Sequence, residues 1–226
     1  MIAEYQKLLE EAFPVSKDVG VYRAISEGVL LADGLISDTP LLNTVVGKDM
    51  RGLIRRAGIM WRLHDLSRSG DVEYEAVMAP MLRGRWHCVE LRSGVFKVHI
   101  CRTDEAGAFP EESMTRFTER SVNPQMELFD DPRVLQLRRA AEVDDLYAYL
   151  TYSVSQRSEI AHFCWSMESR DGGDWVAHID ALTRVKSYQE SQEKSAAEQP
   201  TKATKVKFHD FIQEAISQKG LNDNTA

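Results

Sequence analysis

The stretch that decides the fold is Trp86-His87-Cys88-Val89-Glu90-Leu91-Arg92-Ser93-Gly94-Val95-Phe96-Lys97-Val98-His99-Ile100-Cys101-Arg102. Apolar and polar side chains alternate on both sides of Ser93-Gly94, a pattern typical of two strands joined by a tight turn. We therefore predict a β-hairpin in which Arg92 pairs with Val95. This register places on one buried face Val89, Leu91, Phe96, Val98 and Ile100.

Two further strand-like runs follow, Leu146–Val154 and Ile160–Glu168, and the polar residues 155–159 between them predict a second hairpin. Residues 175–185 fit a strand or a short helix. Upstream of residue 83 the apolar spacing is helical instead. It predicts helices over 2–13, from Ser16 to Gly34, and from Thr39-Pro40 to about Leu66.

The predicted fold class is therefore α+β. A helical part over 1–82, for which a winged helix is one form, precedes a mainly antiparallel sheet with flanking helices. The β-rich domain spans 83–186 and carries a long loop over 104–131. Residues 187–205 lose apolar content and predict a flexible linker. Helical spacing returns over 206–219 and predicts an amphipathic tail helix.

Composition narrows the functional classes. The 226 residues carry a net charge of −7, so bulk electrostatics exclude a general polyanion binder. Three cysteines and an N-terminus without a signal-peptide pattern lead us to expect a cytoplasmic protein with free thiols. No apolar run has the length of a membrane span, so we expect no membrane partner.

One predicted helix is locally basic. Between 48 and 70, six basic residues face two acidic ones, a local excess of +4. Helices followed by a hairpin also resemble the order of winged-helix DNA binders. The predicted phosphate contacts are Arg51, Arg55, Arg56 and Arg62, with Arg85 from the hairpin side. The alternative is an arginine face balanced by acidic side chains nearby.

Cysteine and histidine gather on the second face of the predicted sheet. In the predicted hairpin register Cys88 opposes His99 with Cys101 diagonal, and the later strand adds His162 and Cys164. Thiolate and imidazole are zinc ligands, but no Cys-x-x-Cys knuckle is present. We therefore expect core packing and no cofactor, with zinc as the alternative. The cross-strand neighbours Glu90 and Lys97 predict a surface ion pair.

Catalytic signatures are missing from the sequence. It contains no Gly-x-Ser-x-Gly elbow, no Walker loop and no dinucleotide-binding fingerprint after a strand. We therefore expect a protein that works by binding. A metal-dependent hydrolase or nuclease is the enzymatic alternative.

A pentapeptide within the long loop points to a partner. Gln125-Met126-Glu127-Leu128-Phe129 resembles the Gln-x-x-Leu-Phe signature by which bacterial polymerases and mismatch-repair proteins bind the sliding clamp. The resemblance covers only these five residues. It implies clamp contacts from Gln125, Leu128 and Phe129, whereas the alternative is a loop anchored on its own core. The tail helix offers a second partner-binding face, made of Phe208, Phe211 and Ile212.

These observations lead us to expect a DNA-associated accessory or regulatory protein, recruited to the replication clamp by the pentapeptide. A second alternative is a protein-interaction subunit of a bacterial toxin–antitoxin or phage-defence system, which the tail helix suggests.

Overall fold

The computed structural model describes residues 2–81, 87–125 and 145–198. Contacts along the chain divide it into two compact units, Met1–Gln189 and Glu190–Ala226. The first unit holds the N-terminal helices together with the sheet, and their buried apolar side chains form one core. The predicted domain boundary at residue 82 is therefore wrong, because the helices before it and the strands after it bury their apolar side chains in one core.

Four helices open the chain: α1 (Ile2–Ala12), α2 (Val15–Asp38), α3 (Val45–Asp49) and α4 (Arg51–Ser69). The helix predicted to end at Gly34 continues to Asp38, because glycine inside a helix costs only about 1 kcal/mol. The start predicted at Thr39-Pro40 lies in a turn, and Thr44 caps α3 by accepting a hydrogen bond from the Gly47 amide at 3.1 Å.

Six strands form one sheet in sequential order: β1 (Glu75–Pro80), β2 (His87–Ser93), β3 (Phe96–Arg102), β4 (Leu146–Val154), β5 (Ile160–Glu168) and β6 (Trp175–Asp180). All neighbours are antiparallel except β3 and β4, which are parallel. The α+β class, the mainly antiparallel sheet and the bounds of the second hairpin are therefore confirmed. Strand β1 was not predicted.

The first hairpin forms with a different register. Leu91 pairs with Val98, and Ser93 pairs with Phe96, so the turn consists of Gly94 and Val95. Gly94 has a φ of 58°, a conformation that favours glycine at this position of a tight turn. Because the pairing shifts by two residues, each side chain keeps its predicted face and the predicted buried set is confirmed.

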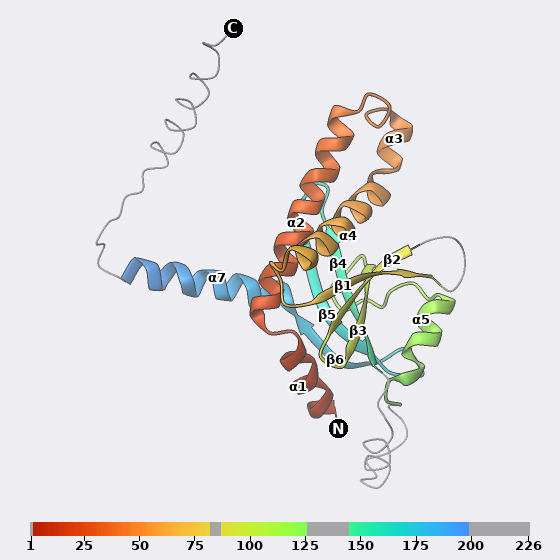
Figure 1. Cartoon of the computed structure of the whole chain (residues 1–226), viewed down its shortest axis with the longest axis vertical. Helices are drawn as coiled ribbons and strands as arrows, with labels where there is room; N and C mark the ends of the chain where they lie inside the picture. The colour runs from red at the N-terminus through yellow and green to blue at the C-terminus, as the bar shows by residue number, and fades with distance from the viewer. Residues whose placement is uncertain (1, 82–86, 126–144, 199–226) are drawn as a thin grey trace. The chain divides into compact units, whose positions relative to one another are not determined.

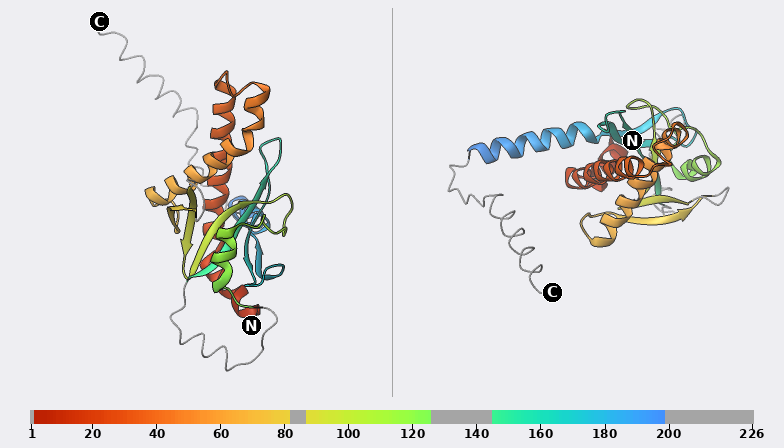
Figure 2. Two further views of the ribbon diagram at one scale, coloured as in Figure 1. Left: turned by 90° about the vertical axis from the view of Figure 1, so that its right-hand side faces the viewer. Right: turned by 90° about the horizontal axis from the view of Figure 1, so that it is seen from above.

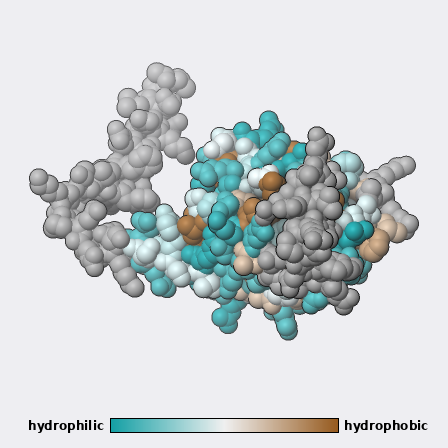
Figure 3. All heavy atoms as spheres, turned by 90° about the horizontal axis from the view of Figure 1, so that it is seen from below, coloured by the Kyte–Doolittle hydropathy of each residue, from teal (hydrophilic) through white to brown (hydrophobic). Residues whose placement is uncertain are grey.

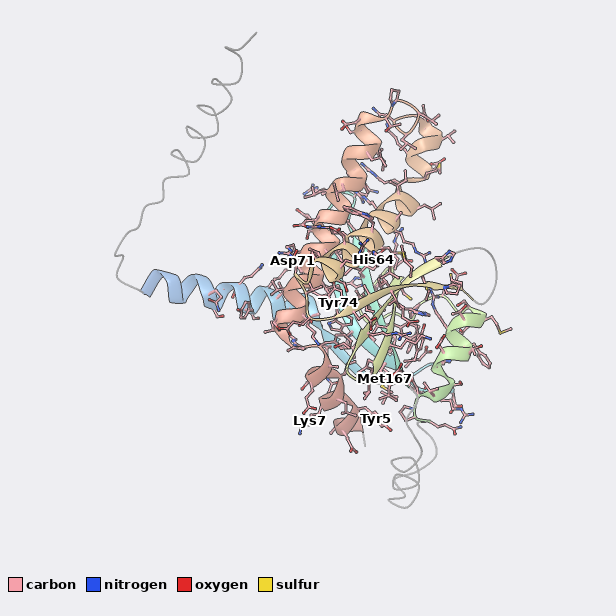
Figure 4. The ribbon with its side chains drawn as sticks, viewed as in Figure 1. Tyr5, Lys7, His64, Asp71, Tyr74 and Met167 are labelled. Atoms are coloured by element: carbon pink, nitrogen blue, oxygen red, sulfur yellow. The ribbon has the colours of Figure 1, made fainter. Side chains whose placement is uncertain are left out.

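The core lies between one face of the sheet and the helices α1, α2 and α4 (Figure 1). The Phe13 ring, next to α1, stacks on Trp165 of β5 with centroids 3.9 Å apart. The Trp165 indole donates a hydrogen bond of 2.7 Å to Asp18 Oδ1 in α2. Met167 and Tyr74 are also buried here, Tyr74 where α4 gives way to β1 (Figure 4).

The opposite face of the sheet is covered by the segment predicted as a long loop. It contains the helix α5 (Met114–Glu119) and the 3-10 turn η1 (Arg120–Val122). The Asn123 side chain holds this segment on the sheet: its amide donates to the carbonyls of Tyr147 and Glu168, each at 2.8 Å. Trp175 Nε1 donates to the Gly107 carbonyl, also at 2.8 Å.

Helix α7 (Ala181–Glu198) follows β6 directly. Asp180 caps it by accepting a hydrogen bond of 3.0 Å from the Thr183 amide. The flexible linker predicted from residue 187 is therefore wrong up to residue 198, because Glu, Gln, Lys and Ala favour helix even without an apolar stripe. The predicted tail helix 206–219 lies outside the described residues.

A winged helix does not fit this topology. Strands β2 and β3 lie inside the sheet, between β1 and β4, so their hairpin does not project freely as the wing of a winged helix does. Within the three described segments, no helix is long and apolar enough to cross a membrane.

Helices α2 and α4 form a long hairpin, closed by α3, that extends beyond the sheet (Figures 1 and 2). The two helices cross where Gly28 meets Gly58. A Cβ atom at Gly28 would lie only 2.6 Å from the Cα of Ile59, and one at Gly58 would collide with the Gly28 carbonyl oxygen. Glycine is required at both positions for this close approach.

Candidate protein-docking surface

The helical hairpin is fixed to the sheet through Arg55, one of the predicted phosphate contacts. Arg55 is buried, and its guanidinium binds both oxygens of Asp33 in α2, at 2.9 and 2.6 Å. It also donates to the Ser155 carbonyl at 3.1 Å and to Ser158 Oγ at 2.8 Å, in the turn between β4 and β5. This bidentate geometry gives the strongest form of the Arg–carboxylate pair.

Asp33 also pairs with a second predicted phosphate contact. Arg51 Nε lies 3.4 Å from Asp33 Oδ1. Burial alone would raise the pKa of Asp33, but hydrogen bonds from Arg55 and Ser158 and the positive charges of Arg55 and Arg51 lower it below its usual value. Asp33 is therefore ionised at neutral pH and balances the charge of this part of the helix.

Three further arginines were predicted to contact phosphate: Arg56, Arg62 and Arg85. Arg62 Nε lies 2.5 Å from Glu27 Oε2, and Arg62 also pairs with Asp65. Arg56 is exposed, and Arg85 lies outside the described residues. Of the four predicted phosphate contacts on this helix, three thus have carboxylate partners. The structure favours the alternative interpretation, an arginine face balanced by acidic neighbours.

The cysteines and histidines of the predicted metal set are all buried. Cys88, Cys101 and Cys164 are all buried, and burial raises the pKa of each thiol, that of Cys164 to about 11. Among the described residues, no group of three or more His, Cys, Asp or Glu side chains is placed to hold a metal ion. The predicted pairing of Cys88 with His99 is wrong, because Glu90 opposes His99.

The two histidines of the predicted metal set have hydrogen-bond partners within the protein. The His99 Nδ1 atom lies 2.8 Å from the Tyr147 hydroxyl, and the His162 Nε2 atom lies 2.9 Å from Thr103 Oγ1. Both contacts lie within or next to the sheet, because Tyr147 belongs to β4 and Thr103 directly follows β3.

Glu90 and Lys97 form the predicted ion pair, but it does not lie on the surface, because Glu90 is buried and Lys97 is half-buried. Glu90 accepts a hydrogen bond of 2.8 Å from Arg92, and Lys97 and His99 lie 3.4 and 3.5 Å from its other oxygen. Burial alone would raise the pKa of Glu90, but these partners lower it to about 2. Lys97 also binds both oxygens of Glu119 at 2.8 Å, which fastens α5 to the sheet.

The end of the helical hairpin carries an unusual concentration of exposed apolar side chains. We call the following six residues the apolar tip: Leu35, Leu41, Val45, Val46, Met50 and Leu53. Their exposed fractions run from 46% for Met50 to 79% for Val45. Between residues 35 and 53 only Ile36 and Gly47 are buried, so this end has almost no core of its own.

An open groove lies on the same hairpin. It has a volume of about 650 Å³, and its apolar lining comes from Leu30, Leu31 and Leu35 of α2 and from Trp61 of α4. Leu30 is 66% exposed and Trp61 is 52% exposed. Gly34 also lines the groove, and a Cβ atom there would meet nothing within 4 Å. The groove enlarges the apolar surface that the hairpin presents.

The hairpin end differs from other parts of the surface. The coloured atoms of the face seen from below are mainly hydrophilic, with small separate hydrophobic spots (Figure 3). Side chains around α3 project outward from the hairpin end (Figure 4), and α3 includes the exposed Val45 and Val46. Exposed apolar residues scattered singly need no explanation, but a cluster on one projecting element indicates an interaction site.

The apolar tip was not predicted. Helical spacing is compatible with an apolar face that includes Leu53 and Trp61, whereas both side chains are exposed. The sequence does contain a relevant pattern. Leu41-Leu42 and Val45-Val46 place four apolar residues in a segment of six, and no element was predicted to cover them. Such residues exceed what a helical turn can bury by itself.

The predicted partner-binding segments lie mostly outside the described residues. Gln125 is half-buried, next to Pro124, whose carbonyl accepts a hydrogen bond of 3.0 Å from the Arg170 amide. Met126 to Phe129 lie outside, as do the tail residues Phe208, Phe211 and Ile212. The clamp-binding resemblance therefore stays a prediction.

Comparisons with protein-family models, with curated proteins and with solved structures found no match to this chain.

Proposed function

We propose that this protein works by binding another protein chain, and that the α2–α3–α4 hairpin is its docking element. The observation that carries the proposal is the apolar tip, six large apolar side chains that are about half to four-fifths exposed on a projecting hairpin. Monomeric proteins rarely leave such a cluster in water, because each side chain buried at an interface gains roughly 1 to 3 kcal/mol.

The way in which the hairpin is fixed supports this role. Asp33, Arg55 and Ser158 join both helices to the β4–β5 turn, and Gly28 and Gly58 bring the helices into backbone contact. The hairpin is thus held firmly at its base. A rigid element that presents apolar side chains binds with a small loss of conformational entropy.

A role in binding DNA through the basic helix has weaker support. Such binding depends on cations that are free to neutralise phosphates. Arg51, Arg55 and Arg62 already neutralise carboxylates, so, among the described residues, Arg56 is the arginine of the predicted set that forms no such ion pair. Recruitment to a sliding clamp by Gln125–Phe129 is compatible with a protein-binding role.

Site-specific photo-crosslinking tests the proposal. The photoreactive residue p-benzoylphenylalanine is introduced at Val46, which is 72% exposed, and the full chain is irradiated in its native cells. We expect a discrete cross-linked protein, which can be another copy of this chain, and we expect its yield to fall when Leu41 and Leu53 are both changed to Ser. The same photoreactive residue at the exposed Glu105, in the segment that follows β3, serves as the matched control.

The proposal fails if Val46 gives no adduct, or if the adducts from positions 46 and 105 are the same. It also fails if the adduct from position 46 is unchanged by the two Ser substitutions, because the captured protein would then not depend on the apolar tip.

A further inference from the structure

We propose that the partner of the apolar tip is a second copy of this chain, joined hairpin to hairpin in a two-fold dimer. This inference rests on the proposed function and names the occupant of the docking surface. The amount of apolar surface, the balance of charge at the hairpin end and the projection of the hairpin each support it.

The exposed apolar area matches what a dimer requires. With roughly 100 Å² still exposed on each of its six side chains, the apolar tip presents about 600 Å² per chain. A two-fold contact uses the same patch on both chains and therefore buries about 1,200 Å² in total, the lower limit for specific interfaces. Leu30, Leu31 and Trp61 of the adjoining groove add to this area.

The charges of the hairpin end permit self-association. The whole chain has a net charge of −7, so two copies repel one another over most approaches. Between residues 34 and 54, however, the acidic Asp38 and Asp49 are matched by the basic Lys48 and Arg51. This is therefore a neutral apolar part of an acidic protein, and a two-fold contact can place acidic and basic side chains of the two copies opposite one another.

The shape of the hairpin also suits a two-fold contact. Because α2 and α4 extend beyond the sheet, two hairpins can lie side by side without contact between the sheets (Figure 2). Two antiparallel helices from each copy would then pack as a four-helix bundle. Gly34 and Gly52 have no Cβ, and a Cβ at either would meet at most one atom within 4 Å, which allows close approach of a neighbouring helix.

Sedimentation velocity on the full chain tests the inference, over total concentrations from about 1 µM to about 200 µM. We expect a monomer–dimer equilibrium for the natural protein. Val46→Glu places a charge in the apolar contact and should weaken dimerisation at least tenfold. Val95→Glu is the matched control: Val95 is 44% exposed in the β2–β3 turn, and its substitution should leave the equilibrium unchanged. Circular dichroism melting verifies that both variants are folded.

The inference is overturned if the natural chain is monomeric throughout this range, or if Val46→Glu dimerises as well as Val95→Glu. A monomeric chain that nevertheless cross-links a different protein from position 46 contradicts the dimer and leaves the proposed docking function standing. A monomeric chain without any tip-dependent adduct contradicts both.

Discussion

Replacement of Arg55 by Ala separates the two interpretations of the basic helix. In the structure Arg55 is buried and joins Asp33 to the turn between β4 and β5. If this role is structural, its loss leaves a partly buried carboxylate without its bidentate partner. If Arg55 were a phosphate contact, its loss would weaken DNA binding and leave folding nearly unchanged.

The expected cost follows from the burial of the pair. Removal of one partner from a fully buried ion pair costs about 3 to 5 kcal/mol. The Asp33 side chain keeps 18% of its surface exposed, and Ser158 Oγ still donates to it, so we expect a smaller cost than this range, about 2 to 3 kcal/mol. Arg56→Ala, one residue away and exposed, should change the free energy of unfolding by less than about 0.5 kcal/mol.

The assay is urea denaturation of both variants and of the natural chain at several pH values. Because the folded-state pKa of Asp33 is lowered, its ionised form stabilises the fold above its unfolded pKa of about 3.9, and this contribution disappears as the pH falls further. The deficit of Arg55→Ala should therefore be full at neutral pH and shrink below about pH 4. An Arg55→Ala variant as stable as Arg56→Ala, with reduced affinity for DNA, would refute the structural role.

Three further predictions concern other parts of the chain. Gly58→Ala should destabilise the fold by about 1 to 3 kcal/mol in urea denaturation, because its Cβ collides with the neighbouring helix. Gly34→Ala, where space is open, should stabilise the fold by about 0.5 to 1 kcal/mol. Equal effects of the two substitutions would contradict the helix crossing. Burial raises the pKa of Asp18 to about 6. As the pH rises from about 4 to about 6 and the buried group ionises, the natural chain should lose up to about 3 kcal/mol of unfolding free energy relative to Asp18→Asn. Parallel pH profiles of the two proteins would argue against this. If the pentapeptide binds a sliding clamp, Leu128→Ala with Phe129→Ala should abolish clamp capture without lowering the melting temperature, and a large fall in that temperature would favour the core-anchor alternative.

Local sequence patterns predicted much of the sheet. The β4–β5 hairpin has the predicted bounds because its strands are runs rich in apolar and aromatic residues and the polar residues 155–159 separate them. Strand β1 was missed because it is a short edge strand that ends in Pro80, a residue that argues against a central strand. The β2–β3 register was wrong because Ser93-Gly94 and Gly94-Val95 are both acceptable two-residue turns, and pairing with the neighbouring strands decides between them.

The candidate site was less predictable, because it depends on contacts between elements distant in sequence. The cations of the basic helix were visible, but their partners Glu27 and Asp33 come from another helix about 20 to 35 residues earlier. The exposure of Leu53 could not follow from periodicity either. A helical stripe indicates that a face is apolar, but tertiary packing determines whether that face is covered.

The central claim, that the apolar tip is covered by another protein chain in the cell, can be tested with a single introduced thiol. The three natural cysteines are buried, so Val45→Cys provides an exposed thiol at the tip, and Glu105→Cys provides one in the segment that follows β3. The measurement is labelling by a membrane-permeant maleimide, in intact cells and in dilute purified protein. We expect the thiol at 45 to be protected in cells and reactive in dilute solution, with the thiol at 105 reactive in both. Equal labelling of the two positions in cells would contradict the docking surface.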